Sequence, residues 1–486
     1  MHRVSKLNAV LEVATAMSSS RNLETLLPLV MKEAARVVEA DRCTLFILDR
    51  DTGELLSRIA QGARGEIRVP LGSGIAGTVA QSGLVINLKD AYSDPRFNRG
   101  FDLANDYRTK SVLAVPMRGA QGETTGVLQA LNAADGAFDA EDEELLLALG
   151  AQAAVAIENA MLYEDISALF EGFVSASVVA IESRDPTTAG HSSRVASLTT
   201  CLAEATQHVS TGPYAGLKFS AEEYQELRYA SLLHDFGKVG VREPVLVKAN
   251  KLYPHELELL EMRFALARKD RELASFRRRL AAAQGGDARA LEALETTRLH
   301  GELAELQSAW DFVVACNRPT VLAQGGFEKL QELSRLSFDA GNDVTRALLT
   351  PHEVSVLSIP RGSLSTDERR EIESHVTHTY RFLSQIPWTK NLKRIPEIAY
   401  AHHEKLDGKG YPRAMASVTI PVQSKMMAIS DIYDALTASD RPYKKAVPHE
   451  KALDILKMET DSGQLDKDLF RIFIEADVPR RALHGG

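Results

Sequence analysis

The feature that most constrains this fold is a long run without proline, from Ala140 to about Arg184. Gly150 and Gly172 are its only glycines, so little in the run interrupts a helix. Apolar and small residues recur along it in alternating steps of four and three, which is the spacing of a heptad seam. The seam consists of Leu149, Ala153, Ala156, Ala160, Tyr163, Ser167, Phe170, Val174, Ser177 and Ile181. We therefore expect one continuous helix that joins an N-terminal domain to a C-terminal domain.

A heptad seam needs a second helix to cover it. The pattern therefore predicts a homodimer in which two connecting helices, residues 140–184, pair in parallel. Such a helix is well placed to carry a rotation or a change of register between the domains. The same spacing also fits a helix that packs against its own domain.

Residues 1–165 mix helical and strand patterns and predict an α+β domain. An amphipathic helix is expected over 4–17, and Asn22 caps a second helix that ends near Val38. Strand patterns follow at 42–48, 54–60, 111–117 and 125–132, and a glycine-rich turn at 72–74 opens a short helix. That turn lacks the lysine of a phosphate-binding P-loop. The order of these elements resembles a GAF domain, a sensory module for small ligands.

The resemblance also suggests ligand-binding residues in the GAF domain. Four residues fit the Asn-Lys…Phe-x-x-x-Asp-Glu pattern of cyclic-nucleotide-binding GAF domains: Asn132, Phe138, Asp142 and Glu143. Ala133 replaces the lysine of that pattern, which leaves the ligand unidentified. Alternatively, Asn132 and Phe138 only stabilise the turn after the last strand.

Two adjacent histidines, His402 and His403, are the strongest chemical signal in the chain. At the end of a helix, two neighbouring imidazoles can fan around two metal ions, one to each. The Asp407–Pro412 segment that follows has turn residues, and Asp407 and Tyr411 are expected to shape this loop. Further candidate ligands lie far away in the chain. In order, the full set is His191, His234, Asp235, His375, His402, His403 and Asp431.

This ordered set resembles the HD phosphohydrolases. With His-His-Glu at 402–404 and Gly-Tyr-Pro at 410–412, it is similar to the HD-GYP subfamily, whose characterised members hydrolyse the bacterial second messenger cyclic di-GMP. The resemblance implies an all-α catalytic domain over 178–486 that holds two divalent ions, with iron or manganese favoured. It assigns His191, His234, Asp235 and Asp431 to one ion. It assigns His375, His402 and His403 to the other, with Asp235 bridging. Some members hold a third ion through a glutamate, but Thr187 stands at that position here.

Paired cations lower the pKa of bound water and offset charge that develops on a phosphodiester. Asp235 and Lys238 are the candidate catalytic residues, and Lys238 is expected to contact a phosphate oxygen. Arg441 and Lys444 are expected to bind the second phosphate, although this basic turn also fits a helix-end cap.

The chain departs from the subfamily between Lys238 and His375. The sequence predicts that residues 252–362 are an insertion. It contains two long charged helices, 256–283 and 287–314, which a turn joins into an αα-hairpin. His255 and His352 are weaker alternatives to His375 as a ligand. The run Arg277–Arg279 is expected to be a solvated face, and the hairpin is a possible contact for a protein partner.

Composition limits the remaining choices. The net charge of −9 argues against general nucleic-acid binding. Three cysteines without CxxC spacing indicate neither a disulfide scaffold nor a zinc ribbon. No apolar run approaches the length of a membrane span and no signal pattern is evident, so we expect a cytoplasmic protein without membrane insertion.

The sequence thus predicts a cyclic di-GMP phosphodiesterase that yields linear pGpG or GMP under the control of a GAF sensor. Two alternatives stay open. One is a catalytically weak adaptor that binds a cyclic dinucleotide or a partner protein. The other is a hydrolase for a mixed cyclic dinucleotide such as cGAMP.

Overall fold

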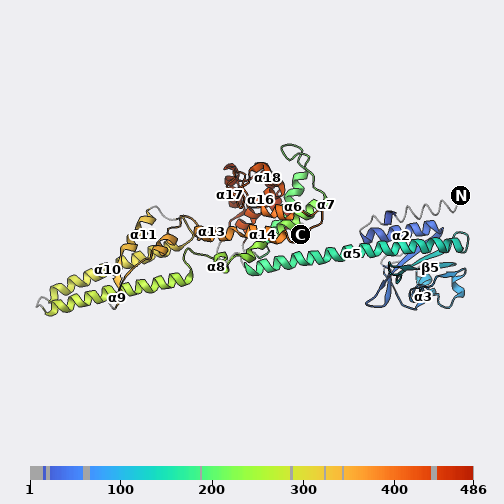
Figure 1. Cartoon of the computed structure of the whole chain (residues 1–486), viewed down its shortest axis with the longest axis horizontal. Coiled ribbons are helices and arrows are strands. Elements are labelled where there is room, and N and C mark those ends of the chain that lie inside the picture. Colours follow the sequence, from blue (N-terminus) through green and yellow to red (C-terminus); the bar gives the residue numbers. More distant parts are fainter. Residues whose placement is uncertain are drawn as a thin grey trace. The chain divides into compact units, whose positions relative to one another are not determined.

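The computed structural model describes residues 15–17, 22–57, 66–104, 106–185, 189–284, 288–321, 325–341, 344–438 and 446–484. Contacts divide the chain into two compact units, Met1–Gly172 and Phe173–Gly486. Helix α5 (Ala140–Arg184) runs without a break from one unit into the other, as the proline-free run predicts (Figure 1).

The first unit is built on a six-stranded antiparallel sheet in the order β3-β2-β1-β6-β5-β4. The strands are β1 (Ala40–Asp49), β2 (Glu54–Ser57), β3 (Ile67–Pro70), β4 (Ile86–Leu88), β5 (Val112–Arg118) and β6 (Thr124–Ala133). The long central pair β1 and β6 is joined by ladder contacts from Ala40–Ala133 to Ile47–Gly126.

Helices cover both faces of this sheet, because side chains of successive strand residues point to opposite faces. Leu45 and Leu128 pack with α2 (Leu23–Val37) and α5 in one core. Phe46 and Val127 point the other way and pack with α3 (Gly74–Ser82) in a second core. The short helices η1 (Ala91–Ser93) and α4 (Arg99–Ala104) follow β4. This α+β arrangement confirms the predicted fold of the first domain.

The N-cap prediction is also confirmed, since the Asn22 side chain accepts hydrogen bonds from the backbone N–H groups of Glu24 and Thr25. The helix expected over 4–17 lies mostly outside the described residues, of which 15–17 are helical.

The predicted seam of α5 proved to be mostly an internal face. Leu149, Ala153, Ala156 and Ala160 are buried in the core of the first unit, where small alanines let the helix approach the sheet closely. Val174, Ser177 and Ile181 are buried as well. Packing against its own domains therefore explains the spacing at both ends of this face, whereas Tyr163 and Ser167 between them are exposed, and pairing with a second chain stays a prediction.

A different face of α5 is left open to solvent. It consists of Val155, Asn159, Leu162, Ile166 and Leu169, all exposed, with Leu169 the most exposed of the apolar side chains at 79%. These positions also follow alternating steps of four and three, so α5 carries a second heptad seam without a cover.

Helix α5 also corrects the expectation about membrane spans. Among the described residues, it is the one helix long and apolar enough to cross a membrane, with a mean hydropathy of 1.6 over an 18-residue window. Alanines and leucines spread through the window raise its hydropathy without forming one solid apolar run. Half of that window is buried inside the protein, as in a core helix, so length and composition are weak evidence for a span.

The second unit is mostly helical, as predicted. Around the site it contains α6 (His191–Gln207), α7 (Ala221–Leu233), η3 (Phe236–Gly240), α8 (Glu243–Leu246), α13 (Thr366–Glu373), α14 (His375–Leu383), α15 (Ile395–Tyr400), η4 (Ser417–Thr419) and α16 (Val422–Thr437). It ends with α17 (His449–Asp461), α18 (Lys467–Glu475) and α19 (Val478–His484). Helices α6, α16 and α18 share one apolar core, which includes Leu202, Met426 and Phe473.

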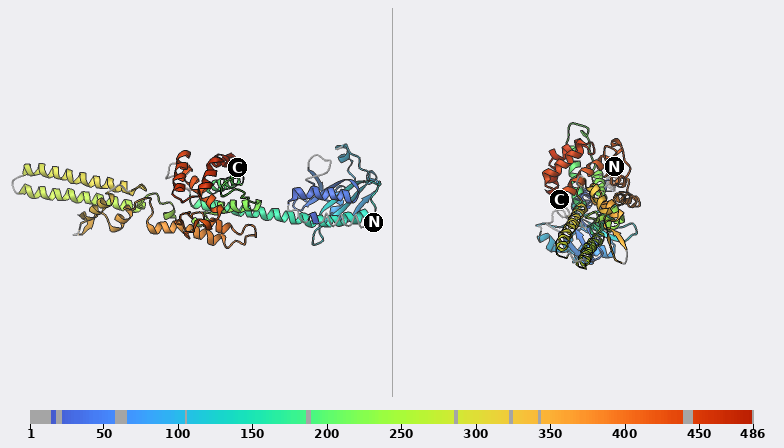
Figure 2. Two further views of the ribbon diagram at one scale, coloured as in Figure 1. Left: turned by 90° about the horizontal axis from the view of Figure 1, so that it is seen from above. Right: turned by 90° about the vertical axis from the view of Figure 1, so that its left-hand side faces the viewer.

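The segment between α8 and α13 holds the two expected long helices, α9 (Pro254–Gln284) and α10 (Ala288–Asn317), which lie side by side (Figure 2). It is more than a hairpin, because α11 (Gly326–Arg335), a two-stranded sheet of β7 (Ser337–Asp339) and β8 (Thr345–Ala347), and α12 (Pro351–Leu357) follow. Leu260, Val313, Leu330 and Leu357 belong to a core of its own. The sequence did not predict this core or its two strands.

Candidate metal centre

The second unit brings all seven predicted ligand residues together. His191 begins α6, His234 and Asp235 follow α7, and His375 begins α14. His402 and His403 follow α15, and Asp431 lies within α16. Three overlapping groups have ligand atoms within 4.8 Å of one another: His375, His402 and His403; His191, His234 and Asp431; and His234, Asp235 and His402.

Three of the histidines are held in the same way. The Nδ1 atoms of His234, His375 and His402 lie 2.7, 2.6 and 2.6 Å from the backbone carbonyl oxygens of Ser231, Ile372 and Ala399. A carbonyl oxygen can only accept, so each Nδ1 carries the proton and each Nε2 keeps a lone pair. All three Nε2 atoms are buried and have no hydrogen-bond partner.

Carboxylates face these lone pairs. Nε2 of His375 lies 3.2 Å from Oδ1 of Asp235, and Nε2 of His234 lies 3.5 Å from Oδ2 of Asp235. Neither contact is a hydrogen bond, because the nitrogen has no proton to donate. Acceptors buried against acceptors are unfavourable unless a cation lies between them. The residues present therefore fit divalent cations, for which imidazole and carboxylate are common ligands.

His191 is oriented by residues that the sequence analysis missed. Its Nδ1 lies 2.7 Å from Oδ2 of Asp434, while Arg194 donates from Nε to Oδ1 of Asp434 at 2.6 Å. This leaves Nε2 of His191 3.2 Å from Oδ1 of Asp431. A carboxylate behind a ligand histidine fixes its tautomer and orientation. Helical spacing could have indicated both residues. Asp434 lies about one turn after Asp431 on α16, and Arg194 lies about one turn after His191 on α6.

The surroundings shift the pKa values of the histidines in different directions across the centre. Burial lowers the pKa of His191, but hydrogen bonds with Asp431 and Asp434 outweigh it and raise the pKa to about 9. Burial lowers the pKa of His403 to about 3 and that of His402 well below its usual range. His402 and His403 are therefore neutral at physiological pH, as a metal ligand must be.

Lys238 lies in the centre but is already paired with carboxylates. Its Nζ is 2.8 Å from Oδ2 of Asp235 and 3.3 Å from Oδ2 of the buried Asp185. Burial raises the pKa of Asp235, but the Lys238 ammonium and nearby histidines outweigh it and hold that pKa well below its usual range. Contact between Lys238 and a phosphate stays a prediction.

The approach of η3 to α14 places Asp235 beside His375, and it depends on Gly237. A Cβ at Gly237 would lie 1.9 Å from the carbonyl oxygen of His375 and 2.5 Å from the backbone nitrogen of Thr379. The Thr379 hydroxyl accepts from the backbone N–H of Gly237 at 2.8 Å and donates to the carbonyl of His234 at 3.0 Å. This one hydroxyl thus joins α14 to the His234-Asp235 pair.

The loop after His403 is closed by Glu404, a further residue that the sequence analysis missed. Its buried carboxylate accepts from the backbone N–H groups of Arg413 and Met415, both at 2.8 Å. Gly408 has a positive φ of 72°, whereas Gly410 is required for close packing against the backbone of Glu404.

The two residues expected to shape this loop do so. Asp407 accepts from the backbone N–H of Lys409 at 3.0 Å. The Tyr411 ring lies over His403, with 4.7 Å between the ring centroids, and the Tyr411–Pro412 peptide bond is cis.

The remaining candidates of the catalytic domain divide into two groups. The competitors of His375 lie elsewhere, since His255 is exposed beside Tyr253, and His352 is 68% exposed beside Glu256. Thr187, Arg441 and Lys444 lie outside the described residues, so the phosphate contacts expected of Arg441 and Lys444 stay predictions.

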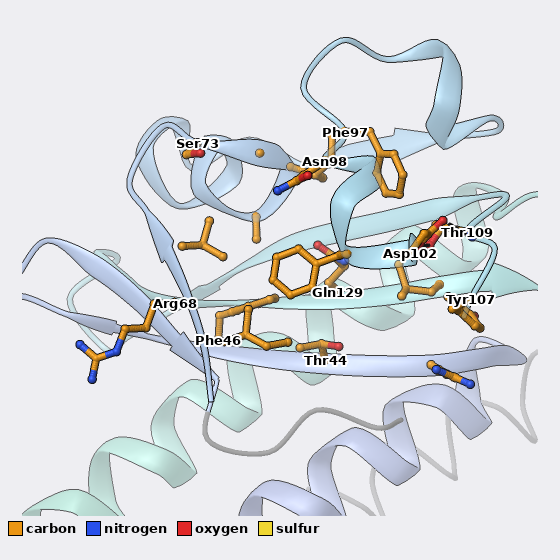
Figure 3. A pocket seen from close by; sticks show the side chains of 18 of the residues that line it. Thr44, Phe46, Arg68, Ser73, Phe97, Asn98, Asp102, Tyr107, Thr109 and Gln129 are labelled. Carbon is orange, nitrogen blue, oxygen red and sulfur yellow. Dashed lines mark hydrogen bonds between the residues drawn. The ribbon is translucent and has the colours of Figure 1, made fainter. Parts of the chain in front are cut away.

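The first unit contains a cavity of about 250 Å³ between β1, β6, α3 and the segment around α4. Figure 3 shows Phe46 and Gln129 on the sheet side and Phe97 and Asn98 opposite them. Asp102 is buried in its wall and fully paired, since it accepts from the Tyr92 hydroxyl, the Thr109 hydroxyl and the Thr109 backbone N–H.

None of the four predicted GAF ligand residues lines this cavity, and their role in ligand binding stays a prediction. Phe138 is buried on the opposite face of the sheet, packed with α2 and α5. Asp142 and Glu143 lie in the first turn of α5, where Asp142 and Asp139 cap each other's backbone N–H groups. The Asn132 side chain holds the segment before β5: it accepts from the backbone N–H of Lys110 at 2.6 Å and donates to the hydroxyl of Tyr107, a lining residue, at 2.8 Å.

Comparisons with known families match each unit separately. Residues 22–157 match the GAF domain model, and residues 345–469 match an HD domain model. The chain combines a GAF domain with an HD domain. The HD match begins late in the insertion and leaves out His191, His234 and Asp235, which the structure nevertheless places beside the four ligands inside it.

Relatives share only part of the chain. It is 34% identical over 150 residues to a probable 3',5'-cyclic phosphodiesterase of Caenorhabditis elegans, covering 28% of this chain and 20% of the relative. It is also 34% identical over 168 residues to a dual 3',5'-cyclic-AMP and -GMP phosphodiesterase of Takifugu rubripes, covering 32% of this chain and 18% of the relative. The chain thus spans about a fifth of the length of these relatives.

Among solved structures, the GAF domain of a phosphoenolpyruvate-protein phosphotransferase from Coxiella burnetii is 26% identical. It covers 34% of this chain and 98% of that domain, with a TM-score of 0.31.

Replacing Gly237 with alanine is expected to separate η3 from α14 and to abolish tight metal binding, because backbone atoms of His375 and Thr379 occupy the space of the new methyl group. The measurement is bound metal per chain after anaerobic loading with Mn²⁺ and desalting. Gly301→Ala is the control, because its Cβ meets nothing within 4 Å in the middle of α10. Equal metal content in both variants would contradict this account.

Asp434→Asn should weaken metal binding by about 10- to 100-fold, the usual effect of removing a carboxylate behind a ligand histidine. Competition with a chelator gives the affinity, and thermal unfolding checks that the variant is folded. Asp461→Asn, at an exposed position on α17, is expected to bind metal like the wild type. An unchanged affinity in Asp434→Asn would show that Asp434 does not orient a ligand.

Proposed function

We propose that this chain is a metal-dependent phosphodiesterase that hydrolyses a cyclic dinucleotide, with cyclic di-GMP as the substrate and linear pGpG or GMP as the product. The observation that carries the proposal is the set of buried Nε2 lone pairs on His234, His375 and His402, aimed at a space bordered by Asp235 and Asp431. Nothing in an ordinary helical core requires such an arrangement.

The groups of ligand atoms support two cation positions. His375, His402 and His403 form one group, while His191, His234 and Asp431 form the other. Asp235 faces both His234 and His375, so it is the bridging residue. The cations, iron or manganese given the absence of sulfur ligands, would supply an activated water and offset negative charge on the phosphate.

The chain's own residues prepare this site. Asp434 and Arg194 orient His191, and the carbonyls of Ser231, Ile372 and Ala399 hold three imidazoles in the ligand tautomer. Lys238 balances the charge of Asp235 and Asp185 and lies where it can shift toward a phosphate oxygen when cations take over Asp235.

The substrate class rests on two supports. The HD domain match and the relatives named for cyclic phosphodiesterase activity favour a cyclic phosphodiester. The Gly-Tyr-Pro loop favours a cyclic dinucleotide through its resemblance to the HD-GYP subfamily, and Tyr411 in this loop lies against His403. We further propose that the GAF cavity binds a small ligand that regulates hydrolysis. Its aromatic residues Phe46, Phe97 and Phe101 suit a planar ring.

Protein loaded anaerobically with Mn²⁺ or Fe²⁺ should convert cyclic di-GMP to pGpG or GMP, as followed by chromatography. His402→Ala and Asp235→Ala are each expected to reduce the rate by at least 1,000-fold, or about 4 kcal/mol in the barrier. His352→Ala is the control, because this exposed histidine lies outside the centre and should leave the rate unchanged.

Two results would contradict the proposal. If the protein hydrolysed a mixed cyclic dinucleotide faster than cyclic di-GMP, the proposed substrate would be wrong. Tight binding without turnover in metal-loaded wild type would make the chain an adaptor instead.

We also propose a homodimer through α5, with the exposed seam in place of the predicted one. In a parallel pair each seam residue lies beside its equivalent, so Ile166→Cys should form a disulfide between chains under mild oxidation. Ala168→Cys is the control, since it is exposed on the far side of the same helix. The native cysteines Cys43, Cys201 and Cys316 are all buried, which keeps the background low. Equal cross-linking of the two variants would exclude pairing through this seam.

A further inference from the structure

Helix α9 of the insertion has an apolar face that none of the described residues covers. Its residues are Leu259, Met262, Leu266, Leu273, Phe276 and Leu280, each between 48% and 63% exposed. At 1.5 Å per residue, this face extends over about 30 Å. Scattered apolar residues on a surface are ordinary, but a continuous row of this length marks an interaction site.

The row has the spacing of a coiled coil. Its steps of three, four, seven, three and four are those of a heptad repeat in which Lys269 takes one position. We refer to these seven residues as the α9 seam. Leu260, Phe264 and Ala267 point to the opposite side of the helix and are buried in the core of the insertion. Helix α9 is thus apolar on two opposite sides, and α10 with its neighbours covers only one.

The charges beside the seam indicate which helix covers it. Glu258 and Glu261 lie at its beginning, and Arg277 and Arg279 lie at its end. Arg278 points elsewhere and donates to Glu295 of α10 at 2.8 Å, so the three arginines do not form one open basic patch. A helix that is acidic at one end and basic at the other complements a second copy of itself in the antiparallel direction.

An antiparallel register pairs six of the seven seam residues with one another and leaves Leu280 at the end of the contact. It sets Leu259 against Phe276 of the second copy, and Met262 against Leu273. In the same register Glu258 lies beside Arg279 of the second copy. A parallel pair would instead place Lys269 against Lys269 of the second copy within the seam, which is unfavourable. At the centre Leu266 meets Lys269, whose long stem can lie along the seam while its ammonium reaches water.

We propose that the α9 seam binds the α9 seam of a second copy of this chain in antiparallel orientation, which joins the two insertions into a four-helix bundle. A polar residue at one seam position favours a single register at some cost in stability, and Lys269 has that effect here. The contact is separate from pairing through α5 and does not depend on the enzymatic activity proposed above.

Two single-cysteine variants of the full chain test the contact and its direction. Leu259→Cys and Phe276→Cys are mixed in equal amounts and oxidised mildly, and each is also oxidised alone. The mixture should form a disulfide-linked dimer at least tenfold above either variant alone. Glu305→Cys, exposed on α10, provides the background level. Cross-linking of each variant with itself would indicate a parallel pair, and yields at background would exclude the contact; either result overturns the proposal.

Charge reversal beside the seam gives a second test that does not alter the apolar residues. In the cysteine background, Glu258→Arg and Arg279→Glu are each expected to lower the cross-linked yield at least twofold. The two changes together should restore it, because the opposite charges face each other again. Glu258 is exposed and Arg279 is half-buried, so thermal unfolding checks that each variant is folded. Failure of the pair of folded variants to restore the yield would exclude the antiparallel register.

Discussion

The rest of this structure depends on one electrostatic constraint, the burial of imidazole lone pairs against carboxylate oxygens. His234, His375 and His402 are fixed in one tautomer by backbone carbonyls, so their Nε2 atoms cannot donate to Asp235 or Asp431. Such a cluster is costly in a helical core and becomes favourable when cations occupy it. The arrangement therefore explains both the choice of residues and their close packing.

The fold has to bring these residues together from distant parts of the chain. The insertion separates Lys238 from His375, yet η3 and α14 meet closely enough that only glycine fits at position 237. Thr379 then connects α14 to the backbone of both His234 and Gly237. The insertion has its own hydrophobic core, so it can lie between two parts of the catalytic domain without contributing a ligand.

Sequence reasoning predicted what depends on residue type and local spacing. The N-cap at Asn22 and the two long helices of the insertion were evident in this way, whereas the seven candidate ligand residues followed from the resemblance to the HD phosphohydrolases. It failed where a partner comes from elsewhere in the fold. Asp434 and Glu404 look like ordinary acidic residues until His191 and the loop at 413–415 are placed beside them. The heptad spacing on α5 was real, but spacing alone cannot distinguish a face that packs on its own sheet from one that pairs with another chain.

Crystallography with anomalous scattering, on protein loaded anaerobically with Mn²⁺ or Fe²⁺, tests the central claim most directly. The account predicts two anomalous peaks in each chain. One lies among His375, His402 and His403, the other among His191, His234 and Asp431, and Asp235 lies between them. The absence of any peak in this cluster at saturating metal, or metal bound only elsewhere, would contradict it.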